Sequence, residues 1–187
     1  YGNFFNGVKI NYEPVRVSFN KVDYGYYLKY DFFDKYLLEQ NGFRDSYIFE
    51  NHLDSISFNH VPDGFSEVSG FSNQIQKDFI SLIDYEKYIF AITVSILTND
   101  NSPHILGANN MHWFYNSVTN KIEPTIREAF IYEDGRLYVS NIKQEFNKIF
   151  DSISFDSVTN SFVEKHGKIK VLYSIKNKLK EIKNYLV

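Results

Sequence analysis

The stretch QIQKDFISLIDYEKYIFAITVSILT, from Gln74 to Thr98, decides how the rest of the chain can fold. Its apolar residues recur every four or five positions, a spacing typical of an α-helix. Toward its end it becomes apolar on every side, unlike a helix on the surface of a domain. We therefore predict one buried central helix around which the other elements pack. The repeating apolar residues are Ile75, Phe79, Ile83, Tyr88, Ile92 and Ile96.

The composition of the whole chain is that of a globular domain. Of its 187 residues, 43% are hydrophobic and 18% are aromatic, which is enough for one core or two small ones. No apolar run reaches the roughly 18 residues of a membrane span, so we expect a soluble protein, with a cytoplasmic location as the default. The absence of cysteine excludes disulfides and thiolate metal sites. Because the chain starts at Tyr1, we expect a processed form or a piece of a longer protein.

Two β-favouring runs precede the first helix. Residues 13–20 alternate apolar and polar side chains, and residues 24–30 form a second run, with a turn between them. The alternation predicts that one face of the first strand is buried. The residues expected to point inward are Val15, Val17 and Phe19.

A short helix and a long connection follow. Asp34 is a suitable N-cap for a helix over residues 35–41, and Gly42 is a suitable stop. Residues 50–73 are rich in Asn, Ser, Asp, Gly and His, which favours an irregular connection.

Beyond the central helix the sequence predicts two hairpins and two more helices. The first hairpin joins residues 111–116 and 121–127 through a turn at 117–120, and the second is centred on Asp134-Gly135, between 129–133 and 136–139. Asn141 with Gln144 forms a capping box for a helix to about Phe150.

Residues 164–187 form the basic C-terminal end of the chain, with seven lysines against two glutamates. Their apolar residues recur every three or four positions, so we predict an amphipathic helix that packs on a domain formed by residues 1–163. Its lysines are expected to be solvated, although such a face could also dock an acidic partner. Nucleic acid is not an expected partner, because the chain has only four arginines. The predicted apolar seam consists of Ile169, Leu172, Ile175, Leu179, Ile182 and Leu186.

The sequence contains none of the common short motifs for metal binding, phosphate binding or nucleophilic catalysis. Its five histidines have no metal-ligand spacing and do not pair usefully, and neither a phosphate-binding glycine loop nor a GxSxG nucleophile elbow occurs. The acidic pairs Asp45/Glu50 and Glu123/Glu128 have a spacing that is common among surface carboxylates, which are usually solvated.

Two stretches nevertheless carry a family resemblance. YGYYLKYDFFDKYLLEQNGFRDSYIF, residues 24–49, and HILGANNMHWFYNSVTNKIEPTIREAF, residues 104–130, resemble segments of the CotH-like kinase family of spore-coat and surface-polysaccharide-cluster proteins. The matching residues of the second stretch are His104, Asn110, Tyr115, Asn116, Thr119, Lys121, Glu123 and Pro124. The resemblance implies an α+β fold with a protein-kinase-like C-terminal-lobe architecture, in which short β-hairpins pack on two or three long helices.

The resemblance also implies a function. This function is ATP·Mg²⁺-dependent phosphoryl transfer to a protein or saccharide hydroxyl, in an active or a degenerate form. Mg²⁺ requires oxygen ligands, and on this mapping Asn110 and Glu128 provide them, with Glu128 at a position where the family has Asp. Asp100 or His104 is the candidate general base. The adenine pocket is mapped to the segment Tyr27, Leu28, Lys29 and Asp31. The alternative is a non-catalytic, pseudokinase-like binding or scaffold module that docks a partner on its C-terminal helix.

Overall fold

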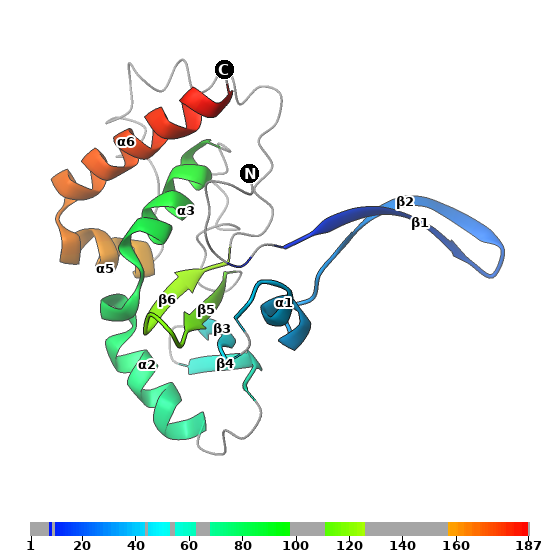
Figure 1. Cartoon of the computed structure of the whole chain (residues 1–187), viewed down its shortest axis with the longest axis horizontal. Coiled ribbons are helices and arrows are strands. Elements are labelled where there is room, and N and C mark those ends of the chain that lie inside the picture. Colours follow the sequence, from blue (N-terminus) through cyan, green and yellow to red (C-terminus); the bar gives the residue numbers. More distant parts are fainter. Residues whose placement is uncertain are drawn as a thin grey trace.

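A computed structural model describes residues 8, 10–43, 45–52, 55–62, 68–97, 111–125 and 157–186 of the chain. The described part is a mixed α+β structure with two small antiparallel sheets and five helices. One sheet lies among the helices, and the other, a two-stranded ribbon, projects away from them (Figure 1). The predicted α+β class is therefore confirmed.

The central sheet has the strand order β4-β3-β5-β6, with every neighbouring pair antiparallel. Its strands are β3 (Tyr47–His52), β4 (Ser55–His60), β5 (His112–Asn116) and β6 (Lys121–Pro124). The predicted hairpin with its turn at residues 117–120 is confirmed as β5 and β6. The prediction that residues 50–73 form an irregular connection was wrong, because β4 lies within this range. There Ile56 and Phe58 alternate with exposed Ser and Asn side chains, which is the pattern of an edge strand with one face covered.

The predicted central helix is two helices, α2 (Val68–Leu82) and α3 (Tyr85–Leu97). The single-helix prediction failed at Ile83, which pairs with Ile122 of β6 in a parallel bridge. The amide of Asp84 then donates to the carbonyl of Ile122 at 2.7 Å. The Asp84 carboxylate accepts from the amide of Lys87 at 3.0 Å, so Asp84 caps the start of a new helix. The prediction of burial is confirmed, since α3 carries a continuous run of buried residues from Tyr88 to Ile96.

Both faces of the central sheet are covered. Trp113 lies on the face that α2 and α3 cover, with its ring 4.9 Å from that of Phe79 and 5.5 Å from that of Tyr88. Phe114, the next residue of β5, belongs to a second cluster on the opposite face. These two neighbouring side chains therefore lie on opposite faces of the sheet, as the alternation along a strand requires. The second cluster consists of Val8, Phe33, Leu37, Leu38, Ile48 and Phe114, with Ile10 and Phe43 at its margin.

Helix α1 (Lys35–Gln40) supplies the cover of that second face. The Asp34 side chain accepts hydrogen bonds from the amides of Tyr36 and Leu37, as the predicted N-cap requires. Gly42 follows with a positive φ of 79°, a conformation that favours glycine at the end of a helix. The predicted short helix is confirmed to within one residue.

Two helices close the described chain, α5 (Ser157–His166) and α6 (Lys168–Leu186), separated by Gly167 with φ 84°. Helix α6 lies beside α3 (Figure 1). Of the predicted seam, Ile175, Leu179 and Ile182 are buried and Leu172 is partly buried, so these four are confirmed. Val171, which was not predicted, is also buried. Ile169 was wrongly placed in that seam, because the chain turns at Gly167 and leaves this side chain 85% exposed. The proposed boundary between residues 163 and 164 falls inside α5.

The projecting ribbon consists of β1 (Tyr12–Phe19) and β2 (Val22–Tyr30), and we call it the arm. Asn20 and Lys21 form its turn, both with positive φ, which suits a tight two-residue hairpin. The prediction of two strands is confirmed. The prediction that Val17 and Phe19 point into a core was wrong, because no layer of the described chain lies against the arm and both side chains are exposed.

Some predicted elements lie outside the described residues. These are the hairpin of residues 129–139 and the helix of residues 141–150. Within the described residues, every helix is too short or too polar to cross a membrane.

Candidate functional site

The candidate site is the end of the β5–β6 hairpin at which both strands connect to the rest of the chain. The Thr125 amide donates to the carbonyl of His112 at 2.9 Å, and its hydroxyl donates to the same carbonyl. Asn110 precedes Met111 directly, and Glu128 follows Thr125 by three residues, a segment that spans at most about 10 Å. The two chain segments that carry the predicted metal ligands therefore leave the sheet at the same end.

A histidine–carboxylate pair lies at this end of the sheet. His112 Nε2 lies 3.0 Å from Glu50 Oε1, across the register that pairs β3 with β5. The ring of Phe33 stacks on the His112 imidazole at 3.7 Å, and Asn59 donates to Glu50 at 3.4 Å. A carboxylate beside an imidazole can fix the tautomer and orientation of the ring. The expectation that no histidine has a useful pairing was therefore wrong for His112.

A second polar cluster holds the hairpin against α3. Lys87 Nζ lies 2.5 Å from Glu123 Oε2, and Asn116 Nδ2 donates to Glu123 Oε1 at 3.1 Å. The Asn116 side-chain oxygen accepts from the amides of Val118 and Thr119 and so fixes the hairpin turn. Glu123 is 1% exposed, so the expectation that it is solvated was wrong. This cluster orders the hairpin that carries the candidate site.

The predicted site residues divide into two groups. The predicted metal ligands and candidate bases, Asp100, His104, Asn110 and Glu128, lie outside the described residues. Those of the predicted adenine pocket lie on β2 or directly after it.

The pocket residues belong to the arm and its base. Tyr27 is exposed, and its Cα partner across the ribbon is Val15. Leu28 pairs with Pro14 in the same ladder, while Lys29 Nζ lies 3.7 Å from a Glu13 carboxylate oxygen. Asp31 accepts hydrogen bonds from the backbone and side-chain nitrogens of Asn11 at 3.1 and 2.8 Å, and these bonds close the base of the arm.

We find no cluster of three or more His, Cys, Asp or Glu side chains with the geometry of a metal site in the described ranges. The pair of Glu50 and His112 offers two such groups. Any Mg²⁺ site at the hairpin end would therefore depend on ligands such as Asn110 and Glu128.

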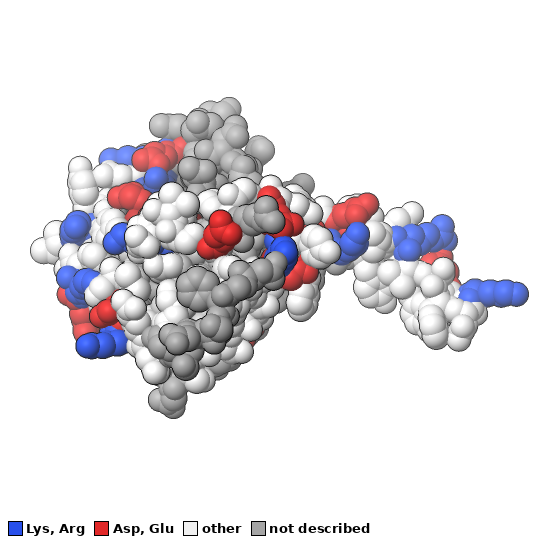
Figure 2. All heavy atoms as spheres, turned by 60° about the horizontal axis from the view of Figure 1, so that its bottom comes forward, with Lys and Arg blue, Asp and Glu red and all other residues white. Residues whose placement is uncertain are grey.

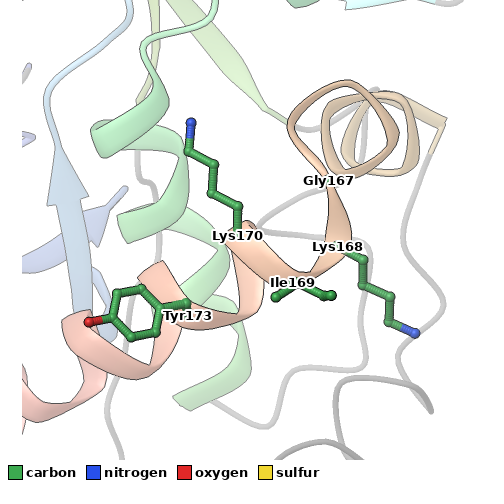
Figure 3. A pocket seen from close by; sticks show the side chains of 5 residues that line it. All are labelled: Gly167, Lys168, Ile169, Lys170 and Tyr173. Atoms are coloured by element: carbon green, nitrogen blue, oxygen red, sulfur yellow. The ribbon is translucent and has the colours of Figure 1, made fainter.

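A surface depression of about 710 Å³ lies elsewhere, at the corner between α5 and α6. It is lined by Gly167, Lys168, Ile169, Lys170 and Tyr173. Figure 3 shows that these side chains point away from one another rather than toward a common centre. Lys170 Nζ lies 4.6 Å from the centre of the Tyr85 ring. The depression therefore lacks the convergent polar groups of a small-molecule site.

His166, at the same corner, makes the stability of the fold depend on pH. Its ring packs against Phe162 and Tyr85 at 4.5 and 4.8 Å. Burial, followed by the charges of Lys165 and Lys170, lowers the pKa of His166 below its ordinary value of 6.5. Because the unfolded chain then binds this proton more readily than the folded chain, stability is lost as the pH falls through that value.

Replacement of His166 with glutamine is expected to reduce this pH dependence. Thermal unfolding between about pH 7.5 and 5.5 should show a smaller acid-induced drop in melting temperature for the variant than for the unmodified chain. Equal drops in the two proteins would show that His166 does not titrate differently in the folded and unfolded states.

Glu50 and Lys87 are the two polar residues of the site region that sequence reasoning missed. Glu50 stands in the apolar strand sequence YIFENH, and an acid in such a strand is a signal for a buried partner. Lys87 gives no comparable signal, because a lysine near the start of a helix is ordinarily solvated.

Comparison of the chain with protein-family models, with curated proteins and with solved structures gives no match.

Proposed function

We propose that this chain is a kinase-like domain that binds ATP·Mg²⁺ and transfers a phosphoryl group to a protein or saccharide hydroxyl. The observation that carries the proposal is the common end of the β5–β6 hairpin, from which the segments bearing Asn110 and Glu128 both depart. In kinases, a metal-binding Asn before such a hairpin and a metal-binding acid after it hold the Mg²⁺ that bridges the phosphates.

The order of elements supports the same proposal. Kinases place a short helix, a buried helix, a catalytic loop and a hairpin in this sequence. Here α1, the buried helix α3, residues 98–110 and the β5–β6 hairpin follow one another, with β3, β4 and α2 inserted after α1. Helix α3 and β6 begin next to each other at the bridge between Ile83 and Ile122.

In the proposed site the amide oxygen of Asn110 and the carboxylate of Glu128 hold the metal. Both are hard oxygen ligands of the kind that Mg²⁺ prefers. Asp100 or His104 acts as the base that accepts the proton of the acceptor hydroxyl. The backbone between Tyr27 and Asp31 contacts the adenine. Glu128 is one methylene longer than the aspartate that the family has at this position, so the phosphotransfer activity is weak or lost.

Nucleotide titration tests the proposal. The melting temperature of the unmodified chain should rise with ATP concentration in the presence of Mg²⁺, because a ligand of the folded state stabilises it by mass action. Asn110→Ala and Glu128→Ala should each remove the Mg²⁺-dependent part of that rise. Asn73→Ala and Glu164→Ala, at exposed positions of α2 and α5, are the matched controls and should leave it unchanged. The absence of any rise at millimolar ATP would refute the proposal.

A second candidate is a non-catalytic binding or scaffold module. The observation that favours it is the exposure of aromatic and apolar side chains on the arm, which a self-contained enzyme domain would not need. In a module of this kind, the basic face of α6 would dock an acidic partner beside the exposed Ile169 and Tyr173. The two candidates differ in the titration above, since the binding module alone predicts no Mg²⁺-dependent stabilisation by ATP.

A further inference from the structure

The exposed apolar side chains of the described residues are concentrated in one region. Nine of the twelve large exposed hydrophobic residues lie between Tyr12 and Tyr36. They belong to the arm and to the segment where it joins the body: Tyr12, Val17, Phe19, Val22, Tyr24, Tyr26, Tyr27, Phe32 and Tyr36. A concentration of this kind marks an interaction surface.

The register of the arm divides its apolar side chains between two faces. One face carries Val15, Val17, Phe19, Val22 and Tyr27 with the Glu13–Lys29 pair, and the other carries Tyr12 and Tyr26 with the Arg16–Asp23 pair. Directly opposed residues of an antiparallel pair lie on the same face. Val15 opposes Tyr27, and Phe19 opposes Val22. Because side chains alternate along β1, both pairs lie on the same face as Val17. We call this face, made of Val15, Val17, Phe19, Val22 and Tyr27, the apolar face of the arm.

No part of the described chain covers the apolar face. Among the described elements, each strand of the arm packs extensively only against the other. An isolated two-stranded ribbon is marginally stable in water, and its period-two pattern is that of a strand with one buried face. In Figure 2 the arm is a narrow projection of mostly uncharged atoms. The sequence is thus patterned for a cover that lies outside the described part of the chain.

The charges of the arm are balanced within it. Residues 11–31 contain three basic and three acidic side chains. Arg16 contacts Asp23, which lowers the pKa of that carboxyl, and Lys29 pairs with Glu13 at 3.7 Å. An arm with zero net charge neither attracts a strongly charged partner nor repels an identical arm.

The two ends of the arm have matching chemistry. Its tip exposes Phe19 and Val22, at 65% and 55%, and its base exposes Phe32 and Tyr36, at 70% and 71%. The nine residues of β2 separate tip from base by about 30 Å. If two arms lie antiparallel, the tip of each therefore meets the base of the other, and the apolar faces lie against each other.

We infer that the arm binds a second copy of this chain, in a two-fold clasp in which the apolar faces pack together and each tip contacts the partner's base. Such a clasp is isologous, because the same surface serves both copies. It does not rest on the proposed function, although the backbone proposed to contact adenine, residues 27–31, belongs to β2 and the base of the same arm.

Sedimentation velocity over a range of concentrations tests the clasp. The unmodified chain should show a monomer–dimer equilibrium. The double variant Phe19→Ser/Val22→Ser should weaken self-association by more than about tenfold, because it removes two buried apolar side chains from each copy. The matched control Val118→Ser/Ile169→Ser changes two apolar residues that are at least as exposed but lie off the arm, and should leave the equilibrium unchanged.

Cross-linking distinguishes the antiparallel clasp from other dimers. Because the chain contains no cysteine, Lys21→Cys at the tip and Tyr36→Cys at the base can be placed in two separate chains and then mixed. A short thiol cross-linker should join tip to base between the two chains more efficiently than tip to tip. A chain that stays monomeric at all concentrations would overturn the inference, as would a dimer that the tip variant does not weaken or that cross-links tip to tip.

Discussion

Replacing Trp113 with alanine is expected to lower the free energy of unfolding by about 3–5 kcal/mol. The Trp113 side chain is 1% exposed and fills the space between the central sheet and the helices α2 and α3. Its ring contacts those of Phe79 and Tyr88, so truncation leaves a cavity lined by aromatic rings that cannot collapse fully. Since small domains have only about 5–15 kcal/mol of stability, this loss removes a large part of what holds the fold together.

Urea denaturation followed by circular dichroism measures this effect. Val118→Ala is the control, because Val118 lies on the same hairpin but is 87% exposed. The control should unfold within about 0.5 kcal/mol of the unmodified chain. Similar midpoints for the Trp113 and Val118 variants would show that Trp113 does not fill the core as described.

Replacing Lys87 with methionine is expected to destabilise the fold by about 3 kcal/mol, the second largest effect. The substitution leaves the Glu123 carboxylate buried beside Asn116 but without its cation. A buried charge that loses its partner costs far more than the pair contributes, because desolvation is no longer offset.

A double-mutant cycle with Glu123→Gln isolates the ion pair. The Lys87→Met/Glu123→Gln variant should be more stable than Lys87→Met alone, because it no longer buries an unpaired charge. Lys180→Met, at an exposed position of α6, is the control and should change stability little. If the two substitutions add without coupling, Lys87 and Glu123 do not interact in the folded chain.

Local signals predicted the elements that depend on local chemistry. The Asp34 cap and the Gly42 stop were sufficient to predict α1, and the polar turn at residues 117–120 was sufficient to predict the β5–β6 hairpin. These signals act within a few residues, so they can be read without knowledge of the tertiary structure.

Elements that depend on tertiary contacts were predicted poorly. The apolar pattern of residues 74–98 continues through Ile83, and only the contact with Ile122 reveals that the helix is interrupted there. The alternation of Val15, Val17 and Phe19 correctly predicts a strand with one apolar face. It does not reveal whether this chain or another molecule covers that face.

The candidate site was partly accessible from the sequence. The resemblance drew attention to Asn116 and Glu123, whose side chains bond to each other. Their partner Lys87 lies on a helix far away in the sequence. The pair of Glu50 and His112 likewise requires the alignment of β3 beside β5, which no local pattern specifies.

The central claim is that Asn110 and Glu128 lie close enough to share one metal ion, and cross-linking of a cysteine pair tests it most directly. In the otherwise cysteine-free chain, Asn110→Cys/Glu128→Cys should be joined within one molecule by a short thiol cross-linker. Asn110→Cys/Val118→Cys, whose second position lies in the turn at the far end of the hairpin, should not. Efficient cross-linking of the control pair without cross-linking of the first pair would contradict the claim.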